Sequence, residues 1–192
     1  MKKLALVLSL VLMLTFVGCS SGAAVKETDA FRFDPKTGYA YSTAPFGIDT
    51  TELESAIGSK LTMVSESPAT APFAYTNCSS EDIVQSADCS GKFDAQFDEN
   101  GKLFSVTFHE QLARGTAEEH FEAASKRFTE TFGAPAVQDD NGIGTQYLEW
   151  QDKSSGTALG FTYSDLGTTD PTLLISVFEK SRYVEAGTGD WK

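Results

Sequence analysis

The residues best suited to metal binding or acid–base catalysis form two short segments, His109-Glu110 and Glu118-Glu119-His120. Imidazole and carboxylate groups are zinc ligands, so a tight turn between the segments could place them around one metal ion. The spacing argues against such a site, because the chain has no His-Glu-x-x-His motif and no two histidines four residues apart. His109 falls on the polar face of a predicted strand, and His120 lies beside the apolar stripe of a predicted helix. We therefore predict no metal ligand and no histidine base.

Other catalytic motifs are absent from the sequence. There is no Gly-x-Ser-x-Gly elbow, no Ser-x-x-Lys, no P-loop and no Gly-x-Gly-x-x-Gly. The acidic segments 98–101 and 139–142 lack the alternating oxygen ligands and terminal glutamate of a calcium loop, so we interpret both as turns. The chain has 27 acidic residues, but none is marked as half of a catalytic pair. We expect a protein that is not an enzyme and has no cofactor, with a small cell-wall hydrolase as the alternative.

The amino terminus carries targeting information. Met1-Lys2-Lys3 precede an uncharged, mostly apolar run, Leu4–Val17, which is too short to cross roughly 30 Å of hydrocarbon as a permanent helix. The segment Phe16-Val-Gly-Cys19 resembles the lipobox of bacterial lipoproteins, although the family usually has leucine where this chain has Phe16. The resemblance implies cleavage of residues 1–18, a diacylglyceryl thioether on Cys19, and acylation of its new amino group by a chain such as palmitate. The alternative is an ordinary secretory signal with an incidental cysteine.

This resemblance also implies a location and affects how the other cysteines are interpreted. A lipoprotein is a membrane-anchored protein of the cell envelope, facing the periplasm or the outside. Such compartments favour disulfide bonds, and Cys78 and Cys89 are the only cysteines after Cys19. We predict that they pair, which would stabilise the loop between them by roughly 3 kcal/mol. Two cysteines without a nearby histidine supply too few ligands for a zinc site.

The net charge restricts the partners of the mature chain. The charge of the whole sequence is −12, and removal of Lys2 and Lys3 with the signal makes it −14. Such an acidic surface repels nucleic acid and anionic lipid headgroups. We expect no nucleic acid to bind, and we expect the membrane contact to come from the anchor at Cys19.

The first half of the mature chain alternates between turns and short periodic runs. Residues 19–30 are small and polar, which is typical of a flexible tether. Aromatic residues on both sides of a Pro-Gly turn predict a hairpin, 31–33 with 39–41. A capping box, Asp49 with Glu52, predicts a helix over about 50–57. A strand is predicted at 73–75, and alternating apolar residues then predict a second hairpin, 93–97 with 104–108.

The second half has the strongest helical pattern. Thr116 and Glu119 form a second capping box, and apolar residues at helical spacing extend to Phe132. Three strands are predicted afterwards, at about 145–151, 157–163 and 172–178. Residues 186–192 have turn composition and are expected to be frayed, so the predicted domain covers 31–185.

The two halves share one order of elements, a glycine-terminated helix, a strand and a hairpin, at offsets of about 70 residues. We predict an α+β fold of antiparallel sheet with two main helices, built from two α-β-β-β repeats at about 46–110 and 115–180. Chance is the alternative, because alternating apolar residues make any two hairpins look similar. This order resembles tandem helix-on-sheet envelope proteins such as the β-lactamase inhibitor proteins and the small assembly lipoproteins of the outer membrane. Both groups are binders, and the resemblance transfers no binding residue.

The expected function follows from the anchor, the architecture and the missing motifs. We predict a lipid-anchored, non-catalytic adaptor or inhibitor that binds an envelope protein through a sheet face or the 78–89 loop. A carrier of a small lipophilic ligand is a further alternative. Most aromatic residues are expected in the core. Five are predicted to face solvent: Tyr39, Tyr41, Tyr163, Tyr183 and Trp191.

Overall fold

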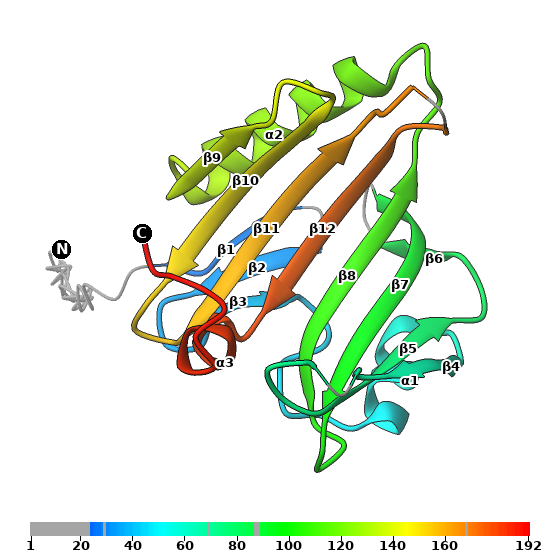
Figure 1. Cartoon of the computed structure of the whole chain (residues 1–192), viewed down its shortest axis with the longest axis vertical. Helices are drawn as coiled ribbons and strands as arrows, with labels where there is room; N and C mark the ends of the chain where they lie inside the picture. Colours follow the sequence, from blue (N-terminus) through cyan, green and yellow to red (C-terminus); the bar gives the residue numbers. More distant parts are fainter. Residues whose placement is uncertain (1–23, 29, 69, 87–88, 168) are drawn as a thin grey trace, which may run out of the picture.

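The computed structural model describes residues 24–192 apart from residues 29, 69, 87, 88 and 168, and only the backbone of Ser86 and Cys89. Within these residues the chain has an α+β fold, which confirms the predicted class (Figure 1). The large sheet contains β4 (Leu61–Glu66), β5 (Tyr75–Ser80), β6 (Val84–Ser86), β7 (Cys89–Asp98), β8 (Leu103–Gln111), β9 (Val137–Asp140), β10 (Thr145–Asp152), β11 (Thr157–Ser164) and β12 (Thr172–Phe178). The small sheet contains β1 (Lys26–Thr28), β2 (Phe31–Asp34) and β3 (Gly38–Tyr41), and the helices are α1 (Thr50–Ile57), α2 (Ala117–Phe132) and α3 (Lys180–Glu185).

The large sheet is antiparallel, and its strand order is symmetric. The order is β4-β5-β7-β8-β12-β11-β10-β9, with β6 paired to β7 outside this path. Each of the two longer helices, α1 and α2, is followed along the chain by four strands of this path. The final strands of the two series, β8 and β12, pair at the centre of the sheet, where Val106 lies opposite Val177. The predicted three-strand unit is therefore wrong by one strand in each half, since the sequence pattern does not reveal β4 and β9.

One face of the large sheet forms the hydrophobic core. Side chains alternate between the two faces of a strand, so each strand sends every second residue to the same face. On the core face these residues are apolar and almost fully buried, including Phe93, Val106, Trp150, Phe161 and Ile175. The α2 helix and the small sheet cover this face, with β3 packed against β11 and β12, and α2 against β1 (Figure 1). No helix or strand of the described residues covers the centre of the opposite face (Figure 1).

The two longer helices begin differently. In α1, Asp49 accepts a hydrogen bond from Glu52 N, and Asp49 N donates to the Glu52 carboxylate, both at 3.0 Å, as the predicted capping box requires. In α2 the helix lies where it is predicted, but the capping box is wrong. Thr116 has a backbone ψ of 4°, and its hydroxyl turns back to the carbonyl of Ala113 instead of capping the helix.

The small sheet corrects the predicted tether and the predicted exposure of three tyrosines. Residues 26–28, placed in the flexible tether by the sequence, form β1 and pair with β2. Tyr39 and Tyr41 are buried because the hairpin of β2 and β3 packs under the large sheet instead of facing solvent. Gly38 makes this contact possible, since a Cβ there would lie only 1.9 Å from Ser155 Oγ. Tyr163 of β11 is buried under α2, where its ring stacks on Phe121.

The carboxyl-terminal segment adds a short helix and packs onto the sheet. After α3, Lys192 N donates to Gln151 Oε1 at 2.8 Å, and the Trp191 ring centroid lies 5.8 Å from Lys180 Nζ. Thr188 N also donates to the carbonyl of Tyr183 at 2.9 Å. Residues 186–192 are therefore packed against the domain, and the prediction that this segment is frayed is wrong.

The backbone does not accommodate the predicted disulfide between Cys78 and Cys89. Cys78 is a buried free thiol on β5, and it lies opposite Ala95 of β7. Cys89 precedes Ala95 by six residues on the same strand, which at about 3.3 Å per residue separates the two cysteines by about 20 Å. Disulfides require Cα atoms within about 7 Å. The predicted stapled loop is instead a hairpin, in which β6 pairs with the first residues of β7.

We therefore expect reduction to leave the stability of the protein unchanged. Burial, followed by the negative charge of Glu54, raises the pKa of the Cys78 thiol, so it should react with maleimide only after unfolding. Urea unfolding with and without dithiothreitol measures the first expectation, and thiol labelling measures the second. A loss of about 3 kcal/mol on reduction would mean that a disulfide does form.

Candidate functional site

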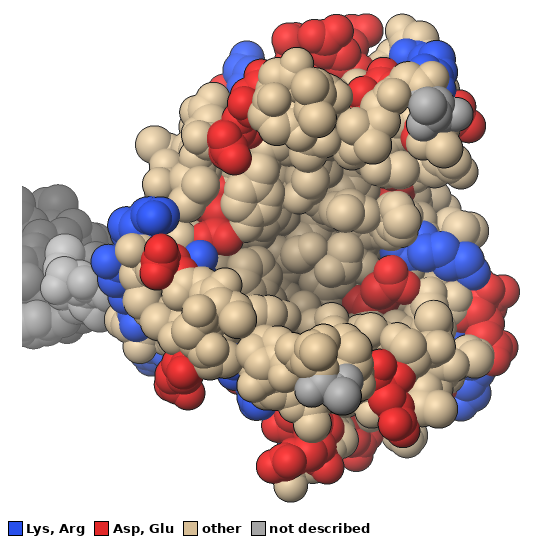
Figure 2. All heavy atoms as spheres, in the orientation of Figure 1, with Lys and Arg blue, Asp and Glu red and all other residues tan. Residues whose placement is uncertain are grey.

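The uncovered face of the large sheet is hollowed into a trough. Two adjoining cavities form it, and both are lined by Gln96, Ser105 and Thr107 near the middle of the sheet. The cavity toward β10 and α3, about 410 Å³ in volume, is here named the α3 pocket. The cavity toward β4 and β5, about 550 Å³, is named the β4 pocket. Figure 2 shows the hollow as largely uncharged, with both acidic and basic side chains on its rim and further acidic side chains on the outer surface.

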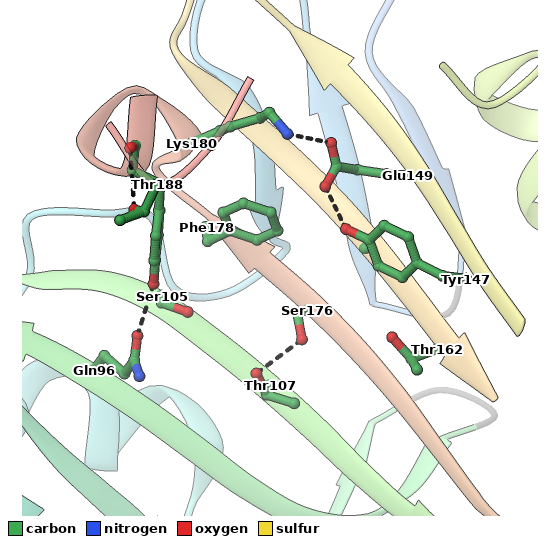
Figure 3. A pocket seen from close by; sticks show the side chains of 13 residues that line it. Gln96, Ser105, Thr107, Tyr147, Glu149, Thr162, Ser176, Phe178, Lys180 and Thr188 are labelled. Atoms are coloured by element: carbon green, nitrogen blue, oxygen red, sulfur yellow. Dashed lines mark hydrogen bonds and ion pairs between the residues drawn. The ribbon is translucent and has the colours of Figure 1, made fainter. Parts of the chain in front are cut away.

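The floor of the trough is made of small hydroxyl and amide side chains. The residues that alternate with the core residues on β7, β8, β11 and β12 include Gln96, Ser105, Thr107, Thr162 and Ser176. Thr107 and Ser176 face each other on paired strands, and their hydroxyls lie 2.9 Å apart (Figure 3). Each hydroxyl has one donor and two acceptor sites, so this pair keeps further capacity for a ligand.

One wall of the α3 pocket holds a buried charged cluster centred on Glu149 of β10. Its carboxylate is 2.6 Å from Lys180 Nζ at the start of α3 and accepts a 2.5 Å hydrogen bond from Gln151. The Tyr147 hydroxyl donates to the second oxygen of the same carboxylate (Figure 3). Glu149 and Lys180 are only 4% and 8% exposed, so their charges compensate each other out of contact with bulk water.

Two buried phenols have raised pKa values, Tyr147 beside Glu149 and Tyr39 in the core on the other face of the sheet. Burial, and then the hydrogen bond and charge of Glu149, raise the pKa of Tyr147 well above its usual range. Burial, and then the charge of Asp152, raise the pKa of Tyr39 to about 12. Both phenols stay neutral in the folded protein at a pH where a phenol in the unfolded chain ionises, near about 10.

Stability should therefore fall at alkaline pH. The contribution of a raised phenol pKa is complete below the unfolded value of about 10 and is lost as pH rises toward the folded value. We expect the free energy of unfolding to fall by about 1.4 kcal/mol per pH unit for each such phenol above about pH 10. Urea unfolding from about pH 9 to about pH 11 measures this slope. Tyr147→Phe should have a shallower slope, and an unchanged slope would contradict the assignment to Tyr147.

The end of the trough at α3 is fixed by aromatic packing and one arginine. The Tyr183 ring contacts Phe73 and Phe178 edge to face, at 5.1 and 5.7 Å between centroids, and its hydroxyl donates to Gln96 at 3.2 Å. Arg182 lies over the Phe104 ring and donates to Asp98 at 3.1 Å. Burial alone would raise the pKa of Asp98, but backbone hydrogen bonds from residues 102 and 100 and the Arg182 guanidinium outweigh it and lower that pKa.

The residues singled out by sequence come together only in part. His109 lines the β4 pocket on the open face, whereas Glu110, the next residue on the strand, points to the opposite face and lies 3.4 Å from His120. The two histidines therefore lie on opposite sides of the sheet. Among the described residues, no group of three His, Cys, Asp or Glu side chains is arranged to hold a metal ion. Cys78 lines the β4 pocket, and Cys19 lies outside the described residues.

The sequence patterns do not single out the residues that line the trough. Ser105, Thr107, Thr162 and Ser176 occupy the polar positions of alternating strands, a pattern that solvent exposure alone would also produce. One signal was present in the sequence: these strands carry hydroxyl residues at positions where exposed strands often carry Lys or Glu.

Comparison with known proteins identifies no relative. No protein-family model, no curated protein and no solved structure matches this chain significantly. In residues 24–192, with the gaps given above, the structure contains no helix long and apolar enough to span a membrane. The function must therefore be inferred from the geometry and chemistry of the trough.

Proposed function

We propose that this chain is a lipid-anchored, non-catalytic protein of the bacterial cell envelope that binds another protein through the trough. The observation that supports the proposal is the uncovered, hollowed face of a sheet whose other face is fully packed. The strands continue across the hollow and place side chains from both halves of the chain on one surface. A rigid floor of this kind presents its hydrogen-bonding groups in fixed positions, which lowers the entropic cost of binding a partner.

The chemistry of the trough favours a protein over the alternative ligands. A lipophilic ligand would require an enclosed apolar cavity, but this hollow is open, and hydroxyl and amide groups lie at its centre beside apolar residues such as Phe178 and Leu174. A hydrolase would require a catalytic pair of carboxylates in the hollow. The α3 pocket contributes only Glu149, which is already held by Lys180, Gln151 and Tyr147, and the β4 pocket contributes only Asp94. A protruding segment of a protein can fill an open trough and satisfy its polar groups.

Charge indicates the surroundings of that segment. The mature chain carries a net charge of −14 once Lys2 and Lys3 are removed with the signal, an excess of acidic groups, although charges of both signs occur on the rim of the hollow (Figure 2). Complementary charge accelerates association and excludes partners of like charge. The proposed partner therefore has an uncharged protruding segment surrounded by basic side chains.

We further propose that the two halves of the sheet arose by duplication. The support is the order of elements, one helix and four strands in each half, and the symmetric strand order with β8 and β12 at the centre. The trough crosses this centre, so a duplicated sheet provides a surface about twice as wide as one unit could. The lipid anchor at Cys19 is supported by the lipobox resemblance and would keep this surface close to a membrane.

Capture of the partner from native cells tests the proposal. Full-length protein is cross-linked mildly in the cells that encode it, purified, and analysed by quantitative mass spectrometry. The trough variant is Thr107→Arg, which fills the floor shared by both pockets. The matched control is Thr129→Arg, the same substitution on the exposed surface of α2, on the opposite side of the sheet.

We expect one dominant envelope protein with the wild type and with Thr129→Arg. Its recovery should fall at least about tenfold with Thr107→Arg, which corresponds to about 1.4 kcal/mol of binding free energy. Equal recovery with Thr107→Arg, or no protein above background, would contradict the proposal. Cys19→Ala tests the anchor separately, because it should abolish incorporation of labelled palmitate and release the protein from membranes.

A further inference from the structure

We propose that the α3 pocket receives an uncharged side chain bearing an amide or hydroxyl group, contributed by the protruding segment of the partner. This inference rests on the proposed function and specifies the chemistry of its central contact. The pocket has a volume of about 410 Å³, within the range of about 300 to 1,000 Å³ found for ligand sites. It is bounded by the floor of the sheet, the β10 wall, and α3 with residues 188 and 189.

The pocket has no charge to offer an ionic ligand. Its lining contains two charged residues, Glu149 and Lys180, and these neutralise each other across 2.6 Å. The carboxylate is further held by Tyr147 and Gln151. An anionic group would have to compete with Glu149 for Lys180, and a cationic group would have to displace Lys180. An ion entering this pocket would thus lose its hydration without gaining a counter-charge.

Two hydroxyls in the pocket are available for hydrogen bonding. Ser105 is 6% exposed, yet its hydroxyl reaches the pocket and has no hydrogen-bond partner among the described residues. Thr162 on β11 likewise lines the pocket, and its hydroxyl has no partner within the part of the chain described. Both hydroxyl oxygens remain accessible from the pocket, so they can pair with a ligand that both donates and accepts hydrogen bonds. An amide or hydroxyl side chain does both.

The aromatic residues favour a protein side chain over a sugar. A sugar ring is held well by an open aromatic face, but the Tyr183 ring is packed edge to face between Phe73 and Phe178. The phenol groups are also engaged, Tyr183 with Gln96 and Tyr147 with Glu149. Gly160 has no side chain to project into the pocket, and a Cβ at this position would lie 3.3 Å from the Tyr147 hydroxyl.

Small blocked amino acids test this chemistry without knowledge of the partner. The probes are the N-acetyl amides of asparagine, aspartate and lysine, together with N-acetylglucosamine, titrated into full-length isotope-labelled protein in detergent micelles. Asparagine and aspartate have nearly the same shape and differ in charge. Binding is followed by the backbone amide resonances of residues 105, 160, 162 and 176. The variants are Ser105→Ala and Thr162→Ala, and the matched control is Thr129→Ala on α2.

We expect the asparagine probe to perturb these resonances saturably, with a dissociation constant at least about tenfold below those of the other probes. Ser105→Ala and Thr162→Ala should each weaken binding of the asparagine probe, and Thr129→Ala should leave that binding unchanged. Equal or tighter binding of the aspartate or lysine probe would overturn the inference, as would preferential binding of N-acetylglucosamine or the absence of any saturable shift. If a partner is captured through the trough but no probe binds, this inference fails while the proposed function stands. If the asparagine probe binds but no partner is captured, the proposed function fails while the assigned chemistry of the α3 pocket stands.

Discussion

Replacing Phe128 by alanine will lower the free energy of unfolding by about 4 kcal/mol, the largest effect that we expect from a single core truncation. Phe128 is 0% exposed on the buried face of α2. Its ring contacts Phe31 of the small sheet and Phe161 of the large sheet, at 6.1 and 5.1 Å between centroids, and also Trp150 at 6.0 Å. The substitution would leave a cavity where three layers of the fold meet. Urea denaturation monitored by tryptophan fluorescence measures the loss.

The matched control for Phe128→Ala is Lys126→Ala on the exposed side of the same helix. Lys126 has one contact of 3.9 Å to Glu130, and both side chains are well exposed, so its loss should change stability by less than about 0.5 kcal/mol. Similar values for the two variants would show that α2 does not join the two sheets through Phe128. A small effect of Phe128→Ala with a changed denaturant slope would instead indicate a rearranged core.

Replacing Lys180 by methionine will destabilise the protein by about 3 kcal/mol, because it leaves the Glu149 carboxylate buried without its counter-charge. Methionine keeps most of the aliphatic length of lysine, so packing changes little. The double variant Glu149→Gln with Lys180→Met removes both charges and should recover most of the stability. Chemical denaturation of the two single variants and the double variant gives the coupling energy directly.

A surface ion pair provides the control for this cycle. Lys192 lies 3.7 Å from Asp190, and both side chains are exposed, so Lys192→Met should cost less than about 0.5 kcal/mol. If Lys180→Met is as mild as Lys192→Met, water reaches the Glu149 carboxylate more freely than its 4% exposure indicates. Failure of the double variant to recover stability would show that Lys180 acts through packing.

Helices and strands were predictable from the sequence where it contains a capping or turn motif at one end and a regular spacing of apolar residues along the element. Asp49 and Glu52 give the start of α1, and the segment 98–101 gives the turn between β7 and β8, where Gly101 has a φ of 70°. Apolar residues at a spacing of two likewise locate the strands that face the core. These signals are local, so they depend on few tertiary contacts.

The missed elements lack such signals. In β4, Met63 and Val64 are adjacent, exposed and next to a register shift, so apolar residues do not alternate along the strand. The β9 strand, Val137–Asp140, has four residues and two aspartates, and only its pairing with β10 makes it a strand. The α3 helix has no side-chain cap at Glu179. Tertiary contacts determine all three elements, and no local pattern in the sequence encodes those contacts.

The site was less predictable than the fold. Glu149 and Lys180 are 31 residues apart and form an ion pair only because β12 pairs with β11, which in turn pairs with β10. The trough floor depends on the strand order, since Thr107 and Ser176 are 69 residues apart in sequence. The sequence could suggest a binding face on a sheet, but it could not name the face or the residues.

The most direct test of the trough as the binding surface is site-specific photo-cross-linking in native cells. Benzoylphenylalanine replaces Val64, an exposed residue on the rim of the β4 pocket, or Thr129 on α2 as the control. We expect light to produce one dominant conjugate with the same envelope protein from position 64 and none from position 129. A conjugate from position 129 without one from position 64 would place the partner on the opposite face and contradict the proposed function.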